Sequence, residues 1–340
     1  MLWLFAGSNE PSERSLPDDG PLYSFNTLLT PPIMCLALLF PGQGSQHVGM
    51  GRSLADAYPE AARVFEEADD VLEFSISKLA WEGPEEDLVL TKNAQPAMLV
   101  HSTAVCRVIQ SRLGEVGMAA GHSLGEFSAH VAAGTLDFAA AVATVRLRGE
   151  LMYAAGVERP GTMAAVIGLD DGAVISVCEQ AQGGAGICVP ANFNASGQVV
   201  ISGDIVGVER GMELAMERGA KRVVRLSVSG AFHSPLMAPA AAEFEDRLAS
   251  VSFRDPAFPV IANVTAQPVS TGDAAKALLV RQLTTPVQWA ASVLHMADSG
   301  VDRFLEIGPG SVLRGLSRRI ARRIPCVSLG EPEDLDAWEP

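Results

Sequence analysis

A nucleophilic serine is indicated by the run Gly121-His122-Ser123-Leu124-Gly125, which has the pattern G-x-S-x-G. The apolar residues 116–120 before it predict a short buried strand, and residues 126–133 after it predict a helix. Strand, sharp turn and helix are the context that this motif requires in a nucleophile elbow. We therefore expect Ser123 to project from a strand end, where the amino terminus of the next helix stabilises developing negative charge.

A serine hydroxyl is a weak nucleophile and needs a general base, for which the sequence offers six histidines. His122 adjoins Ser123, so its side chain is expected to diverge from that of the serine. His233 lies in the loop 229–235, after a predicted strand at 220–228. Because such a loop can reach a site built at strand ends, His233 is the candidate base. Three histidines in predicted helices are interpreted as packing or surface residues: His101, His130 and His295.

A glycine loop and an arginine could complete such a site. The loop Gly42-Gln43-Gly44 follows a predicted strand at 35–40, and it either presents backbone amides to an oxyanion or forms a simple tight turn. His47 stands where G-x-G-x-x-G needs its third glycine, which disfavours dinucleotide binding. Arg148 lies in a largely apolar helical stretch, 145–152. An inward-facing arginine there needs an anionic partner, either a substrate carboxylate or a structural ion pair.

Alternating strands and helices position these residues and predict an α/β fold. Residues 162–228 read as strand, helix, two strands, helix and strand, and this βαββαβ order is the ferredoxin-like pattern. The pattern interrupts α/β alternation on both sides, so we interpret it as an inserted subdomain. The predicted boundaries are 34–158 and 229–340 for the larger subdomain and 159–228 for the smaller. Residues 1–33, rich in Pro, Ser, Asp and Gly, are interpreted as a flexible extension.

The composition argues against several classes of protein. With 25 basic and 40 acidic residues the net charge is −15, a field that repels nucleic acid. No apolar stretch approaches the ~20 residues that span a bilayer, so no membrane association is expected. Five scattered cysteines lack metal-ligand spacing, which predicts thiols in a reducing cytoplasm and no metal.

Taken together, the motifs resemble the malonyl-CoA:acyl carrier protein transacylases of fatty acid synthesis and the acyltransferase domains of polyketide synthases. The resemblance covers residues 35–330, and its landmarks occur in family order: LLFPGQGSQHVGMG, AQPAML, GHSLGEFSA, RLRGELM, GTMAAVIGL, NFNASGQVVISG, VSGAFHSPLM, RQLTTPVQW and EIGPGSVL. The resemblance implies an α/β-hydrolase-like large subdomain with a ferredoxin-like insertion. It also implies a monomer without a bound cofactor.

The resemblance implies the site residues one by one. Ser123 attacks the thioester and carries the malonyl group, while His233 acts as general base and then as general acid. The backbone amides of Gln43 and Leu124 form the oxyanion hole. The backbone carbonyl of Gln282 orients the histidine in place of an aspartate, so that the site is a Ser–His dyad.

Substrate and partner follow from the same resemblance. Arg148 binds the free carboxylate of malonyl-CoA, and bulky Phe232 crowds the α-methyl branch of methylmalonyl. The acceptor is holo acyl carrier protein, which is acidic and needs a local positive surface. Two basic patches are candidate docking surfaces and are equally compatible with ordinary solvated surface: Arg318, Arg319, Arg322 and Arg323, or Lys221, Arg222 and Arg225.

Rival functions share this scaffold. An acyl-thioester hydrolase would use Ser123 and His233 but would not require Arg148. A subunit that only binds acyl carrier protein would need none of the three. A free-standing acyltransferase of a polyketide synthase, or a malonate decarboxylase subunit, would keep the chemistry and change the pathway.

Overall fold

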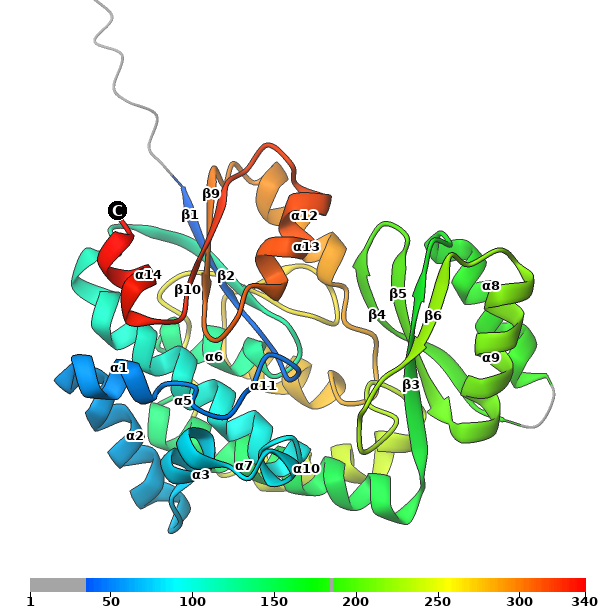
Figure 1. Cartoon of the computed structure of the whole chain (residues 1–340), viewed down its shortest axis with the longest axis horizontal. Helices are drawn as coiled ribbons and strands as arrows, with labels where there is room; N and C mark the ends of the chain where they lie inside the picture. The colour runs from blue at the N-terminus through cyan, green and yellow to red at the C-terminus, as the bar shows by residue number, and fades with distance from the viewer. Residues whose placement is uncertain (1–34, 184–185) are drawn as a thin grey trace, which may run out of the picture. The chain divides into compact units, whose positions relative to one another are not determined.

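The computed structural model describes residues 35–183 and 186–340. The predicted extension, residues 1–33, lies outside the described residues. The described part contains one sheet of six strands and one of four (Figure 1). No helix within it is long and apolar enough to cross a bilayer.

The larger sheet has the strand order β10-β9-β1-β2-β7-β8. Its strands are β1 (Leu36–Phe40), β2 (Val116–Gly121), β7 (Val260–Ile261), β8 (Pro268–Val269), β9 (Arg303–Ile307) and β10 (Cys326–Leu329). All neighbours run parallel except the antiparallel pair β7 and β8. Phe40 pairs with Gly121, so the loops after β1 and β2 leave the sheet at the same level. This register brings the Gly42 loop beside the serine motif.

Helices cover both faces of this sheet, because the residues of β1 alternate between two hydrophobic cores. One core is completed by α12 (Trp289–Asp298) and α13 (Val312–Ile320). The other core takes residues from α1 (Arg52–Ala57), α2 (Pro59–Leu72), α3 (Ile76–Glu82), α4 (Glu85–Leu88), α5 (Thr91–Ile109), α6 (Gly125–Ala132), α7 (Phe138–Glu158), α10 (Ala238–Leu248), α11 (Gly272–Arg281) and α14 (Pro332–Ala337). Two short 3₁₀ turns, Gln110–Arg112 and Pro235–Met237, lie next to α5 and α10.

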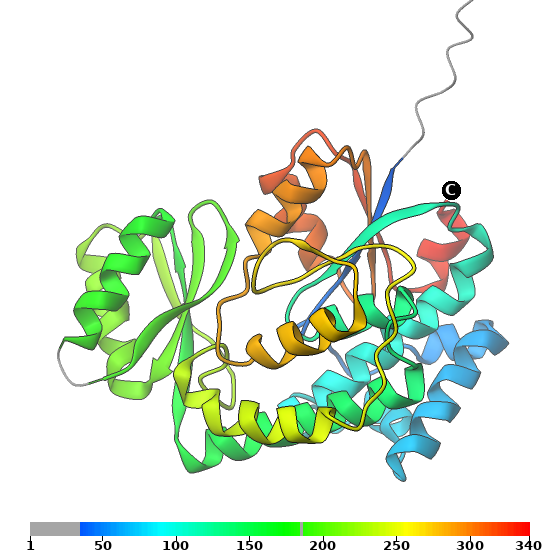
Figure 2. The same ribbon diagram turned by 180° about the vertical axis from the view of Figure 1, so that it is seen from behind.

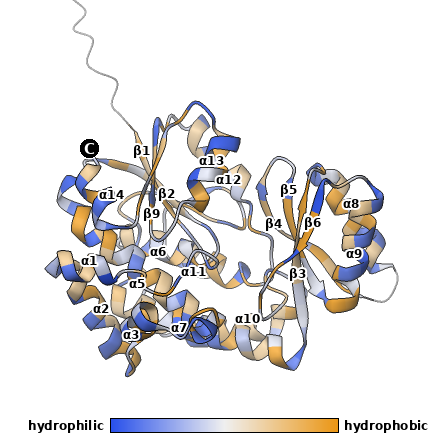
Figure 3. Cartoon of the chain, viewed as in Figure 1, coloured by the Kyte–Doolittle hydropathy of each residue, from blue (hydrophilic) through white to orange (hydrophobic). Residues whose placement is uncertain are grey.

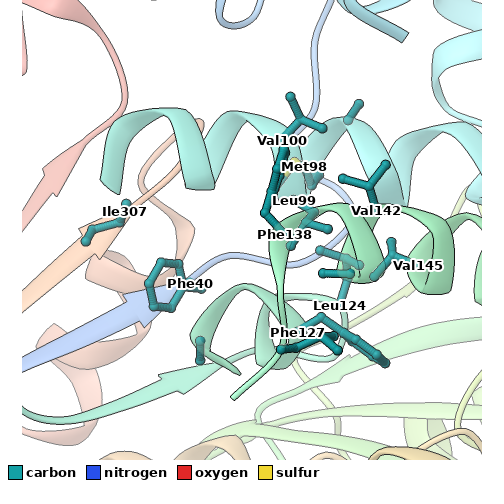
Figure 4. Packing of buried hydrophobic residues seen from close by; sticks show 14 of the residues in the cluster. Phe40, Met98, Leu99, Val100, Leu124, Phe127, Phe138, Val142, Val145 and Ile307 are labelled. Carbon is teal, nitrogen blue, oxygen red and sulfur yellow. The ribbon is translucent and has the colours of Figure 1, made fainter. Parts of the chain in front are cut away.

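The core that includes residues of α5, α6 and α7 fixes the helices that carry the site. Figure 4 shows Phe40 and Ile307 at strand ends and Leu99, Phe127 and Val142 on helices α5, α6 and α7 in one buried cluster. Close packing of this kind holds the three helices rigidly against the sheet. The serine motif, the AQPAML segment and Arg148 are thereby held in one layer.

The smaller sheet is antiparallel, with the order β4-β5-β3-β6. Its elements follow the chain as β3 (Gly161–Ile167), α8 (Asp171–Gln182), β4 (Cys188–Ala195), β5 (Gln198–Asp204), α9 (Ile205–Glu217) and β6 (Arg222–Arg225). Both helices pack on one face over a separate apolar core (Figure 2). This arrangement is the predicted ferredoxin-like subdomain, and its boundaries at 159 and 228 stay a prediction.

Two local features of the fold have clear causes. Helices α1 and α2 are separate, because Pro59 cannot donate a backbone hydrogen bond and begins a new helix after Tyr58. The strand expected over 220–228 ends at Arg225. The residues after it are therefore loop, which gives His233 the reach that the site requires. Figure 3 shows hydrophobic colouring concentrated on the strands and on inward helix faces.

Candidate active site

The turn between β2 and α6 has the geometry of a nucleophile elbow. Ser123 has φ 51°, in the left-handed region that side chains rarely adopt. The glycines on either side are required by close contacts. A Cβ on Gly121 would lie 1.9 Å from the backbone of Gly125, and a Cβ on Gly125 would lie 2.1 Å from the carbonyl oxygen of Phe40. The turn is therefore tight enough to aim the serine hydroxyl away from the strand.

Ser123 and His233 meet at this turn. Ser123 Oγ lies 2.9 Å from His233 Nε2, and His233 Nδ1 lies 2.8 Å from the backbone oxygen of Gln282. A carbonyl oxygen only accepts, so Nδ1 carries the proton and Nε2 is left to accept the serine proton. The pair is thus oriented for general base catalysis without an aspartate.

The histidine is neutral at rest. Burial lowers the pKa of His233 to about 3, with a smaller lowering from the positive charge of Arg148, while the hydrogen bond to Gln282 raises it. His122, next to the serine, points elsewhere: its Nε2 lies 2.8 Å from Asn194 Oδ1 on β4, and its ring lies beside Trp289. The imidazole beside the serine hydroxyl is therefore that of His233.

One amide of the elbow is free to bind an anion. The amides of His122, Ser123 and Gly125 donate to Phe40 O, Asn263 Oδ1 and His122 O respectively. Among the described residues the Leu124 amide has no acceptor, and neither has the amide of Gln43 in the loop after β1. Two unengaged amides on adjacent loops have the chemistry of an oxyanion hole. The Gln43 side chain is anchored, since its Oε1 accepts from Thr91 Oγ1 at 2.7 Å.

Arg148 reaches the serine from α7, and its side chain is buried. Its Nη2 donates to Gln282 Oε1 at 2.8 Å and to Ser123 Oγ at 3.3 Å, and its Nη1 donates to Gln95 Oε1. Of the five guanidinium N–H groups, the one on Nε has no partner among the described residues, and one on Nη1 is not used by these bonds. Burial lowers the pKa of Arg148 to about 10, so the group stays cationic at neutral pH. The arrangement is a buried cation that contacts the serine oxygen through Nη2, the nitrogen that forms a bidentate edge with the unpartnered Nε.

Four polar residues that sequence reasoning did not single out support the site: Thr91, Gln95, Glu126 and Asn263. Gln95 Nε2 donates to Thr91 Oγ1 at 2.8 Å, which links the Gln43 loop to Arg148. Asn263 accepts from the Ser123 amide at 2.7 Å and donates to Gly121 O at 2.6 Å, which holds the elbow. The sequence pointed to two of these four residues only by their position: Gln95 lies in AQPAML, and Glu126 directly follows the serine motif.

The remaining predicted residues are Phe232 and the two basic patches. Phe232 is buried, with its ring against Gly230. Arg319 on α13 donates to Gln198 and Ser196 at the β4–β5 turn, whereas Arg225 pairs with Glu209. The structure therefore does not favour one basic patch over the other.

The chain is similar in sequence to known acyltransferases. Residues 37–328 match the model of a family described as acyl transferase domain. The chain is 45% identical to a malonyl CoA-acyl carrier protein transacylase of Bacillus subtilis, over 88% of this chain and 95% of that protein. A protein of the same name from Escherichia coli K12 is 45% identical, with coverage of 88% and 97%.

Solved structures give the same result. The crystal structure of an acyl carrier protein S-malonyltransferase from Vibrio cholerae has a TM-score of 0.86 at 44% identity, covering 89% of this chain and 99% of that one. A type II PKS acyl-carrier protein in complex with its malonyl-transacylase also matches, with a TM-score of 0.86 at 42% identity over 89% and 98% of the two chains.

Proposed function

The chain belongs to the acyl transferase family, among the malonyl CoA-acyl carrier protein transacylases, and we propose that it performs their reaction through a malonyl ester on Ser123. The observation that carries this proposal is a single constellation. Ser123 Oγ lies 2.9 Å from the base nitrogen of His233 and 3.3 Å from the Arg148 guanidinium. The base and the buried cation thus both contact the oxygen atom that serves as the nucleophile.

The first half of the proposed reaction loads the enzyme. Ser123 Oγ attacks the thioester carbonyl of malonyl-CoA while His233 Nε2 takes the hydroxyl proton. The negative charge on the former carbonyl oxygen is stabilised by the amides of Gln43 and Leu124. The carbon–sulfur bond then breaks, and the CoA sulfur leaves with the proton from His233.

The second half transfers malonyl to holo acyl carrier protein. The phosphopantetheine thiol gives its proton to His233 and attacks the malonyl-serine carbonyl. The carbon–oxygen bond breaks, and His233 returns the proton to Ser123 Oγ. No redox step or metal enters this scheme, so we propose that malonyl-CoA is needed as a substrate and that no further cofactor is needed.

Arg148 is proposed to select the acyl group. Its Nη2 lies 3.3 Å from Ser123 Oγ, where the carboxylate of a bound malonyl group can accept from the guanidinium, and without that anion a buried cation is left poorly compensated. A bound carboxylate also offsets the charge that helps to lower the pKa of His233, which makes the imidazole a better base once malonyl is bound. Acetyl thioesters gain neither effect. Phe232 is proposed to disfavour an α-methyl branch.

We also propose a pathway, a cellular location and an oligomeric state. The product supplies extender units for fatty acid or polyketide synthesis in the cytoplasm. The protein acts as a monomer, without nucleic acid or a membrane as partner. Analytical ultracentrifugation and cell fractionation would test these two points, and a dimer or a membrane fraction would contradict them.

Intact-protein mass spectrometry tests the proposed function. Brief mixing with malonyl-CoA is expected to add one malonyl group to the wild-type chain and none to Ser123→Ala, and holo acyl carrier protein is expected to discharge it. An adduct that decays to free malonate without the carrier protein would indicate a hydrolase instead. No adduct with malonyl-, acetyl- or methylmalonyl-CoA would contradict Ser123 as the nucleophile.

A further inference from the structure

Glu126 is a buried carboxylate beside the site that the proposed reaction does not use. It lies one turn after Ser123 on α6 and is 0% exposed. Its Oε2 accepts from Gln282 Nε2 at 2.6 Å and from the Asn263 amide at 3.1 Å, while Oε1 has no partner among the described residues. A buried carboxylate with so few donors is costly, and a nearby cation can offset part of that cost.

The nearby cation is Arg148, and one amide separates the two charges. Gln282 donates from Nε2 to Glu126 and accepts at Oε1 from Arg148 Nη2 at 2.8 Å. Arg148 forms no ion pair within the described part of the chain. Glu126 is therefore close enough to balance the buried arginine but does not occupy its N–H groups.

The carboxylate and the backbone oxygen of Ser123, which accepts from Gln282 Nε2 at 3.1 Å, both favour one orientation of the Gln282 amide. A carboxylate accepts only and a guanidinium donates only, so only one orientation of the amide satisfies both. The opposite orientation would set its oxygen against Glu126 and its NH₂ group against Arg148. The backbone oxygen of the same residue holds His233, so Gln282 joins the cation to the base.

We propose that Glu126 is a positioning residue for recognition of the acyl carboxylate: it fixes the Gln282 amide, which holds the Arg148 guanidinium beside Ser123 for the malonyl carboxylate. This inference rests on the proposed function. A direct Glu–Arg pair would balance the charge equally well but would consume the donors that the substrate needs. The intervening amide keeps charge balance and leaves those donors available.

Steady-state kinetics of Glu126→Gln with malonyl-CoA and acetyl-CoA test the inference. Burial raises the pKa of Glu126 to about 7, and the wild-type carboxylate is still ionised at pH 8 because that pH lies above this value. The neutral variant is expected to raise the KM for malonyl-CoA about tenfold, because the hydrogen bond from Gln282 Nε2 to a carboxylate becomes a weaker bond to a neutral amide oxygen. The kcat stays within about threefold, since the carboxylate contact exists equally in ground and transition state. The preference for malonyl- over acetyl-CoA falls by the same factor as KM rises.

A matched variant separates positioning from general destabilisation. Glu306→Gln makes the same change at a buried glutamate that bonds the amides of Leu313 and Arg314 at the start of α13. It is expected to keep the wild-type preference for malonyl-CoA. Glu126→Asp keeps the charge but shortens its reach to Gln282, and its preference is expected to lie between those of wild type and Glu126→Gln.

The outcomes are distinct. If both Glu126 variants keep the wild-type preference, or if they lower kcat on both substrates equally with KM unchanged, Glu126 is not a positioning residue. If Glu126→Gln does not fold, a wild-type preference in Glu126→Asp still overturns the inference. If the wild-type chain itself shows no preference for malonyl-CoA, the proposed function fails and the inference falls with it.

Discussion

Strands β2 and β9 flank β1, and each continues through a sharp turn into a helix, yet the two turns are built differently. After β9 the left-handed positions are taken by Gly308, with φ 142°, and Gly310, with φ 81°. After β2 the left-handed position is taken by Ser123, with φ 51°. Glycine adopts this conformation at little cost, whereas serine is strained there. The comparison indicates that the β2 turn keeps a strained side chain because chemistry needs it.

A buried glutamate accompanies each turn, and the two are satisfied to different degrees. Glu306 accepts from the amides of Leu313 and Arg314 and from Ser328 Oγ, at 2.7 to 3.0 Å. Glu126 leaves one oxygen without a partner among the described residues. Burial raises the pKa of both carboxyl groups, but three hydrogen bonds offset part of this effect at Glu306, whereas Glu126 is held beside Arg148 with its charge only partly compensated. The β9 turn is organised for stability, and the β2 turn is organised for the site.

The largest expected effect is on the rate of acylation in His233→Ala. Without the base, the rate of malonyl loading on Ser123 is expected to fall about 10³- to 10⁴-fold. Rapid-quench mass spectrometry measures this rate. His130→Ala is a matched control, because His130 is equally buried in the domain but lies away from the serine hydroxyl. A loss as large in the control would remove the distinction between base and core histidine.

In the β9 turn, Gly308→Ala is expected to lower the free energy of unfolding by about 3 kcal/mol. The new Cβ would meet Ser102 Oγ at 2.6 Å and a Pro41 carbon at 2.7 Å, in a conformation that alanine rarely adopts. Urea denaturation measures the change. Gly315→Ala, in α13 with nothing near its Cβ, is expected to be neutral or stabilising by about 0.5 to 1 kcal/mol. Equal losses in both variants would mean that the β9 turn does not depend on glycine.

Replacing Glu126 or Glu306 by glutamine is expected to change the free energy of unfolding at pH 8 in opposite directions. The folded pKa of Glu126 is raised from 4.5 to about 7 by burial, so its contribution to stability is present below pH 4.5 and is lost as pH rises through 7. That loss amounts to about 3 kcal/mol at 1.36 kcal/mol per pH unit. Glu126→Gln removes this buried charge and is expected to raise the free energy of unfolding by about 1 to 3 kcal/mol at pH 8, where the lower figure allows for the counter-charge that Arg148 loses.

Glu306→Gln is expected to lower stability at the same pH, because an amide cannot accept all three of the bonds that the carboxylate accepts. Urea denaturation of both variants at pH 5 and pH 8 measures the contrast. A gain for Glu126→Gln that does not grow between these pH values would show that its buried charge is not destabilising.

The smallest expected effect compares two substitutions of the serine. Ser123→Gly and Ser123→Ala both remove the hydroxyl, but only glycine relieves the left-handed strain. The glycine variant is expected to be more stable than the alanine variant by about 1 kcal/mol, whereas the same exchange at an unstrained position costs about 0.5 to 1 kcal/mol. Thermal unfolding of both variants measures the difference. A less stable glycine variant would mean that the elbow is not strained.

The sequence predicted those parts of the fold and site that follow from local pattern. The order of strands and helices indicated both subdomains, because long apolar and periodic runs specify elements strongly. Strands β8 and β10 and helices α3, α4 and α14 were missed, since they are two to seven residues long and depend on packing for their stability.

Within the site, motif and resemblance drew attention to Ser123, His233 and Arg148, and the structure brings all three to one oxygen atom. Asn263 and Glu126 could not be identified in this way. Their roles depend on which side chains meet across α6, α7 and the loops after β2 and β7, and such contacts between distant segments leave no periodic signal in the sequence.

The measurement that tests the central claim most directly is the ratio of kcat/KM for malonyl-CoA to that for acetyl-CoA. The wild-type chain is expected to prefer malonyl-CoA by more than about 100-fold, since a buried cation without its carboxylate is costly. Arg148→Ala is expected to abolish this preference. Arg146→Ala is the matched control on the same helix, because Arg146 bonds to Glu150 and Asn93 instead of to the site, and it is expected to keep the preference. An Arg148→Ala variant that still preferred malonyl-CoA would contradict carboxylate recognition by this arginine.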